Sequence, residues 1–128
     1  MYVVSVQAHY DSAHFLRNYK GKCEKLHGHR YVVEAALTSE ELNQAGLAYD
    51  FVDVKRHLRE LADRLDHENI NELPPFTELE PSAENQARFF FDELKERMPG
   101  DMKDALLYVR VWETPTQWAQ YSEKTLAF

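Results

Sequence analysis

The sequence predicts an α+β domain in which two helices lie on one face of a four-stranded antiparallel sheet. Two observations lead to this prediction. Four segments have the composition or the two-residue alternation of strands, and two segments repeat apolar residues at the period of a helix. These segments follow one another in the order strand, strand, helix, helix, strand, strand (ββααββ). With 128 residues, 44% of them hydrophobic, the chain is expected to form a single domain, 1–128, around one core.

The first half of the chain is expected to contain two strands and a helix. Residues 2–10 are rich in Val and Tyr, and residues 29–38 alternate between two faces. Residues 47–51 are expected to form a short extended piece after a turn. Apolar residues then recur at helical spacing from about Val52 to Asp66.

The second half is expected to contain a helix and two strands. The three prolines between residues 69 and 81 indicate a loop. Ser82 is a suitable N-cap for the helix that follows, and this helix ends at Pro99-Gly100. Residues 107–113 alternate as a long strand, and residues 118–121 begin a fourth strand after a turn.

The charge distribution limits the kinds of partner. A net charge of −7 argues against a surface that binds nucleic acid. Residues 17–30 nevertheless carry five basic residues and one acidic residue, a local charge of +4. This basic patch favours an anionic substrate such as a phosphate ester, although a solvated basic loop would have the same composition.

The sequence also suggests where the protein is found. No apolar run approaches the ~20 residues that cross a membrane, so no membrane partner is expected. No signal peptide is visible, and the single cysteine cannot form an internal disulfide. We therefore expect a cytoplasmic protein.

Three histidines near the N-terminus indicate a metal site. His27 and His29 flank Gly28, and residues i and i+2 of an extended segment point to the same face. His14 follows the first expected strand, so an antiparallel partner would bring it opposite the pair. Three imidazoles bind zinc and leave its fourth position open, as a catalytic zinc requires, although such sites also accept iron, cobalt and nickel. The alternative is that the two-residue spacing of histidines arises by chance.

Four other side chains are candidates for chemistry. Cys23 lies in the basic patch, where neighbouring cations favour the reactive thiolate form. Asp66 stands beside His67 and could orient its ring, although a histidine is also ordinary at the end of a helix. Glu113 is in line with the apolar residues of its strand. It therefore either faces the core, where it needs a partner, or lies in water at the end of the strand.

Six segments, in order over nearly the whole chain, together resemble the 6-pyruvoyltetrahydropterin synthase and 6-carboxytetrahydropterin synthase superfamily. The segments are Tyr10-Asp11-Ser12-Ala13-His14, Cys23-Glu24-Lys25-Leu26-His27-Gly28-His29, Ala48-Tyr49-Asp50-Phe51, Leu65-Asp66-His67, Pro81-Ser82-Ala83-Glu84-Asn85 and Val111-Trp112-Glu113-Thr114. The resemblance implies the tunnelling fold, in which the sheets of several subunits join into a barrel. It also implies a homohexamer of two trimers, with active sites at subunit boundaries.

Residue by residue, the resemblance implies a zinc enzyme. His14, His27 and His29 would bind Zn²⁺, and Cys23 would abstract a proton. Asp66 and His67 would complete the proton relay of Cys23, and Glu113 would hold the pterin ring.

The gap of three residues between Cys23 and His27 resembles the 6-carboxytetrahydropterin synthases of queuosine (7-deazaguanine) biosynthesis. The implied reaction converts 7,8-dihydroneopterin triphosphate to 6-carboxy-5,6,7,8-tetrahydropterin, acetaldehyde and triphosphate. Lys22 and Lys25 of the basic patch are candidates to bind the triphosphate. Three alternatives stay open: 6-pyruvoyltetrahydropterin synthesis, cleavage of a pterin side chain for folate, and a non-catalytic protein that binds zinc or pterin.

Overall fold

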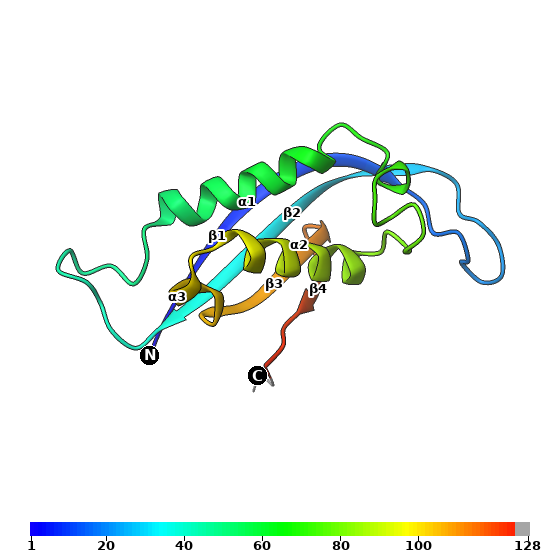
Figure 1. The fold of residues 1–128 in the computed structure, drawn as a ribbon. Helices are drawn as coiled ribbons and strands as arrows, with labels where there is room; N and C mark the ends of the chain where they lie inside the picture. The colour runs from blue at the N-terminus through cyan, green and yellow to red at the C-terminus, as the bar shows by residue number, and fades with distance from the viewer. Residues whose placement is uncertain (125–128) are drawn as a thin grey trace.

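The computed structural model describes residues 1–124 and confirms the predicted fold class (Figure 1). Its elements follow the predicted order, with a single-turn 3-10 helix η1 and a short helix α3 in addition. Their bounds are β1 (Tyr2–His14), β2 (His27–Ser39), α1 (Phe51–Leu65), η1 (Ile70–Glu72), α2 (Ala83–Arg97), α3 (Gly100–Lys103), β3 (Leu106–Thr114) and β4 (Gln117–Tyr121).

The four strands form one sheet in the order β1-β2-β3-β4, and every neighbouring pair is antiparallel. Helices α1 and α2 lie on the same face of this sheet, with α1 over β1 and α2 over β3 and β4 (Figure 1). The β1–β2 connection and the segment between the two helices lie together at one end of the sheet. Strands β1 and β4 are left as the two edges of the sheet.

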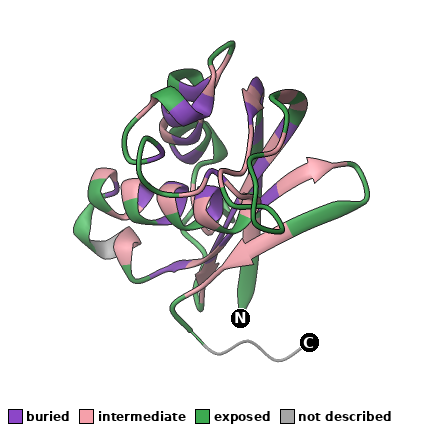
Figure 2. Ribbon diagram, turned by 90° about the vertical axis from the view of Figure 1, so that its right-hand side faces the viewer, coloured by how far each residue is buried: buried purple, intermediate pink, exposed green. Residues whose placement is uncertain are grey.

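The core lies between the helices and the sheet (Figure 2). Strand residues that point toward the helices are buried, and their neighbours in sequence are more exposed, as a half-buried sheet requires. At the centre, the rings of Tyr10 and Tyr31 stack with centroids 5.0 Å apart, and Phe90 of α2 packs against Tyr10. All three residues are fully buried.

The other face of the sheet is polar and aromatic. On it, the guanidinium of Arg110 lies 3.9 Å from the ring centroid of Trp118 and donates hydrogen bonds to Gln120. The same guanidinium lies 3.7 Å from the carboxylate of Glu34. No helix among residues 1–124 is long and apolar enough to cross a membrane.

Two local predictions differ from the structure. Residues 47–51 are not an extended piece: bends precede Asp50, whose carboxylate accepts a hydrogen bond from the Val52 amide and so begins α1 at Phe51. Strand β1 runs four residues beyond its predicted end because its pairing with β2 continues to His14. This extension places His14, expected just past the end of the strand, inside the sheet.

Candidate active site

Strands β1 and β2 bring the three predicted metal ligands together. The register places Ser12 opposite His29 and His14 opposite His27, so the three histidines share the face of the sheet that carries the helices. Their ring centroids lie 4.8 to 5.2 Å apart. One ring nitrogen from each of the three lies within 4.8 Å of the others.

Backbone carbonyls orient two of these rings. The Nδ1 atom of His14 lies 2.7 Å from the carbonyl oxygen of Pro81, and that of His27 lies 2.8 Å from the carbonyl oxygen of Lys25. A carbonyl only accepts hydrogen bonds, so Nδ1 carries the proton in both rings and the lone pair is on Nε2. This is the arrangement in which an outer partner fixes a histidine as a metal ligand.

Two of the three Nε2 atoms also lack a hydrogen-bond partner in the described structure. The Nε2 atoms of His14 and His29 are both buried. Burial lowers the pKa of His29, which favours the neutral ring that binds a metal. Buried polar atoms normally have a partner, and a metal ion would supply it. The three side chains therefore fit a zinc ion or a similar metal.

Glu113 faces the histidines rather than open water. It follows Val111 on the core face of β3, and its Oε1 atom lies 3.3 Å from Nε2 of His14 and 3.5 Å from Nε2 of His29. Its side chain is 30% exposed. Glu113 lines a pocket of about 570 Å³ together with Gly28, His29 and Trp112. This volume is in the range of small-molecule sites.

Asp66 and His67 form the pair that the sequence predicts. One carboxylate oxygen of Asp66 lies 2.9 Å from Nδ1 of His67, and the other accepts a hydrogen bond of 2.8 Å from the Asp11 amide. That bond from the Asp11 amide, assisted by His67, holds the pKa of Asp66 below its ordinary value. His67 itself adopts a left-handed backbone conformation, with φ 59°. Its amide donates to the Asp11 carbonyl, so the exposed imidazole stands beside the end of β1.

The remaining predicted residues lie on the β1–β2 connection. Cys23, Lys22 and Lys25 are all exposed there. Within residues 1–124, no hydrogen bond or ion pair joins Cys23 to Asp66 or His67. One chain thus brings together the histidines and Glu113, and separately the Asp66–His67 pair.

The base of this connection is fixed to the rest of the chain. The guanidinium of Arg17, counted in the basic patch, donates hydrogen bonds to the carbonyls of Asn71 and Phe76 and pairs with Glu80. Glu24 accepts a hydrogen bond from the Leu16 amide. Arg17 is therefore occupied by structural contacts, and Arg30 of the same patch pairs with Asp11. No hydrogen bond or ion pair joins the ammonium groups of Lys22 and Lys25 to another group within residues 1–124.

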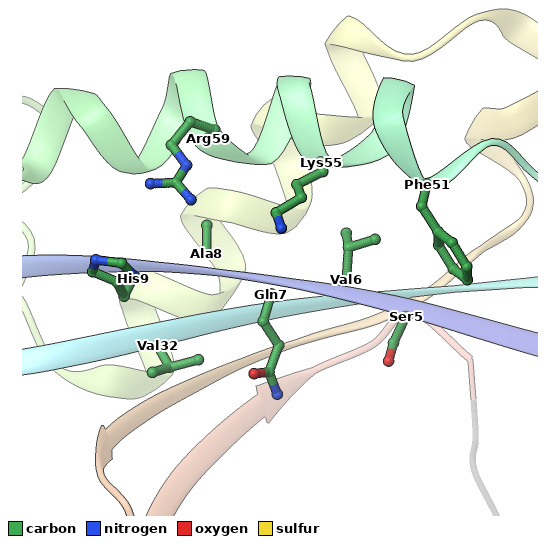
Figure 3. Close-up of a pocket in the computed structure, with 9 residues that line it drawn as sticks. All are labelled: Ser5, Val6, Gln7, Ala8, His9, Val32, Phe51, Lys55 and Arg59. Carbon is green, nitrogen blue, oxygen red and sulfur yellow. The ribbon is translucent and has the colours of Figure 1, made fainter.

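A second hollow, of about 760 Å³, lies along the edge of β1 (Figure 3). Lys55 and Arg59 reach into it from α1, and His9 lines it from the strand. His9 therefore contributes to a different surface from that of the three clustered histidines.

Sequence reasoning missed two residues of the site, Gln86 and Pro81. Gln86 is a fully buried polar residue on α2, and its amide donates to the same Pro81 carbonyl that orients His14. The one feature of the sequence that could have indicated Gln86 is its position directly before Ala87, which belongs to the apolar stripe of the helix. A carbonyl has no signal in a sequence.

Comparisons with known proteins agree with this geometry. The sequence matches the model of the family described as 6-pyruvoyl tetrahydropterin synthase over residues 3–124. It is 34% identical over 127 residues to 6-carboxy-5,6,7,8-tetrahydropterin synthase of Aquifex aeolicus, covering 80% of this chain and 77% of that relative. It is 32% identical over 103 residues to 6-pyruvoyl tetrahydrobiopterin synthase of Dictyostelium discoideum, covering 79% and 73%.

A solved structure shows the same fold. The 6-pyruvoyl tetrahydropterin synthase of Caenorhabditis elegans superposes with a TM-score of 0.80 at 25% identity, covering 97% of this chain and 98% of that one. The chain belongs to the 6-pyruvoyl tetrahydropterin synthase family. It is therefore an enzyme of the tetrahydropterin synthase type, built on the tunnelling fold.

Proposed function

We propose that this enzyme converts 7,8-dihydroneopterin triphosphate and one molecule of water to 6-carboxy-5,6,7,8-tetrahydropterin, acetaldehyde and triphosphate, a step of queuosine biosynthesis that we place in the cytoplasm. The observation that carries the proposal is the cluster of His14, His27 and His29, with two buried Nε2 atoms that have no hydrogen-bond partner among the described residues. The carboxy branch is supported by the name of the Aquifex aeolicus relative and by the three-residue gap between Cys23 and His27.

The three histidines are proposed to hold Zn²⁺ through their Nε2 atoms. When bound, zinc supplies a Lewis acid that makes hydroxyl groups of the substrate side chain easier to deprotonate. Pro81 and Lys25 keep the Nδ1 atoms protonated, so two of the ligands are oriented before any metal arrives.

Glu113 is proposed to hold the pterin ring. The amino group and ring N–H of a pterin present two donors in one plane, which suits the two oxygens of a carboxylate. Glu113 stands in the wall of the pocket beside the histidines, so a ring bound to it carries its side chain close to them. Such positioning lowers the barrier by holding the reacting atoms within reach.

Cys23 is proposed as the group that removes a proton from the substrate side chain, with His67 and Asp66 as its relay. Asp66 already holds Nδ1 of His67, which leaves Nε2 of that ring for proton transfer. Because no hydrogen bond or ion pair joins Cys23 to this pair within residues 1–124, we propose that two subunits of a homohexamer, built from two trimers, complete the relay. Lys22 and Lys25, exposed beside Cys23, are proposed to receive the triphosphate.

The test is to incubate the zinc-loaded protein with 7,8-dihydroneopterin triphosphate and identify the products by mass spectrometry. Acetaldehyde together with 6-carboxytetrahydropterin is expected. A pyruvoyl pterin would instead support the second candidate, 6-pyruvoyltetrahydropterin synthesis, which the Dictyostelium discoideum relative favours. Cleavage to a shortened pterin would indicate the folate route. Zinc binding with no turnover would support a non-catalytic protein that binds zinc or pterin.

A further inference from the structure

A fully buried amide lies behind the histidine cluster. Gln86 stands in the first turns of α2 and has no exposed surface. An apolar side chain would fill this place without removing an amide from water, which is costly unless the amide regains its hydrogen bonds. The partners of Gln86 therefore indicate what the amide adds to this position.

Both ends of the amide have partners. Nε2 of Gln86 donates a hydrogen bond of 3.0 Å to the Pro81 carbonyl, and Oε1 accepts one of 2.6 Å from the hydroxyl of Tyr10. The same carbonyl is 2.7 Å from Nδ1 of His14. Tyr10, Gln86, Pro81 and His14 thus form one continuous chain of hydrogen bonds.

Each proton in this chain has only one possible place. The Pro81 carbonyl can only accept, so both His14 Nδ1 and the amide nitrogen of Gln86 must donate to it. The amide oxygen of Gln86 then faces Tyr10, whose hydroxyl must donate. Burial beside Tyr31 raises the pKa of Tyr10, so its hydroxyl keeps the proton.

The position of the shared carbonyl is also fixed. The side chain of Asn85 donates a hydrogen bond of 3.0 Å to the Glu80 carbonyl, and the Ser82 hydroxyl accepts one of 3.2 Å from the Asn85 amide. Pro81 is therefore held between two residues that are tied to the first turn of α2. Helix α2 sets where the acceptor for His14 lies.

We propose that Tyr10 and Gln86 are positioning residues, which hold the Pro81 carbonyl so that His14 presents Nε2 to a bound metal. The proposal rests on the metal site of the proposed function. It assigns a role to two core residues that touch neither the metal nor the substrate. Outer partners of this kind typically change metal affinity about 10–100-fold.

The test compares Gln86→Met and Tyr10→Phe with the wild type by titration of the metal-free proteins with Co²⁺ alone. Gln86→Met keeps the length of the side chain and removes both hydrogen bonds. It is expected to bind Co²⁺ about 10–100-fold more weakly and to change the visible absorption of the bound ion, which reports its coordination geometry. Tyr10→Phe removes one oxygen and should cause a smaller loss in the same direction.

The control is Leu94→Val, a buried position further along α2. This substitution should lower the melting temperature and leave Co²⁺ affinity and absorption unchanged. The proposal would be overturned if both positioning variants bound Co²⁺ with wild-type affinity and showed an unchanged absorption spectrum. If Gln86→Met fails to fold, Tyr10→Phe alone decides the question. A wild-type protein that binds no Co²⁺ would overturn both the metal site and the positioning role. A wild-type protein that binds Co²⁺, with variants that bind it equally well, would overturn the positioning role alone.

Discussion

The protonation of the clustered histidines depends on groups that lie close to them in the fold, most of which are far from them in the sequence. Carbonyls from two different loops fix His14 and His27, and a carboxylate from a third strand faces His14 and His29. Periodicity predicts that His27 and His29 share a face, because the two-residue period is a property of any strand. It does not predict the Pro81 carbonyl, since main-chain acceptors are the same at every position.

Removing the charge of Glu113 should weaken pterin binding without removing the metal. A hydrogen bond to a charged group contributes about 1.5–3 kcal/mol, so Glu113→Gln is expected to bind a non-reactive pterin about 10–100-fold more weakly, while zinc content stays near that of the wild type. Pterin fluorescence titration and metal analysis measure the two effects.

Glu34→Gln is the matched control for Glu113→Gln, because Glu34 lies on the opposite face of the sheet beside Arg110. It should leave pterin affinity unchanged. Equal loss in both variants would show that Glu113 does not hold the ring.

Asp66 should make the fold sensitive to acid. Hydrogen bonds, chiefly from the Asp11 amide, hold the pKa of Asp66 below its ordinary value of 3.8. A carboxyl with a lowered folded-state pKa stabilises the protein above its unfolded pKa, and this contribution is lost as the pH falls through the folded value. Thermal melts of metal-free Asp66→Asn between pH 6 and 2.5 should therefore depend less on pH than those of the wild type.

The exposed Asp63 on α1 provides the comparison for Asp66. Asp63→Asn is expected to follow the wild-type acid profile. An Asp66→Asn protein with the wild-type profile would mean that the carboxylate does not contribute in this way.

Helices were easier to predict from the sequence than strand ends or loops. Both helices begin and end within a residue or so of their expected bounds, because apolar residues at helical spacing are a local signal. For α2, the capping Ser82 and the following Pro-Gly are local signals as well. The extension of β1 to His14 is not local, since it depends on the partner strand. Gln86 was missed because a polar residue beside an apolar stripe is ordinarily read as facing water.

The cap of α2 should have a measurable effect on stability. The Ser82 hydroxyl accepts a hydrogen bond from the Asn85 amide, and loss of such a cap typically costs about 1 kcal/mol. Ser82→Ala should therefore lower the free energy of unfolding in urea by that amount. Ser82→Asp, which also supplies a capping oxygen, should retain most of the stability; similar losses in both variants would place the effect elsewhere.

At the scale of the whole molecule, the proposed relay requires Cys23 of one subunit to meet Asp66 and His67 of another. A four-stranded sheet with two free edges, β1 and β4, has places for neighbouring subunits to pair. The sequence alone predicts the separate parts of the site, because each part is a short motif. The sequence does not predict a contact between residues of two different subunits, because such a contact produces no pattern along one chain.

Mixed oligomers test this arrangement. Cys23→Ala and His67→Ala are each expected to lose turnover. Oligomers assembled from equal amounts of the two variants should regain about a quarter of wild-type activity if each site takes its cysteine and histidine from different subunits of a symmetric assembly. Subunits carrying both substitutions, mixed with wild type, are the control for assembly.

No recovery in mixed oligomers of confirmed composition would show that each relay lies within one chain. The native mass, measured by light scattering, should be six times the 15.1 kDa of one chain. A fully active monomer would contradict active sites at subunit boundaries.

The left-handed backbone of His67 has a consequence for how this protein can change over time. A residue other than glycine in this conformation costs about 1–2 kcal/mol, and glycine or asparagine would accept it more readily. The proposed relay therefore keeps an imidazole at a position whose backbone conformation favours glycine or asparagine. A lineage released from the need for that relay could relieve the backbone by replacing His67 with glycine or asparagine, at the loss of the contact with Asp66, so the relay and the backbone compete at this residue.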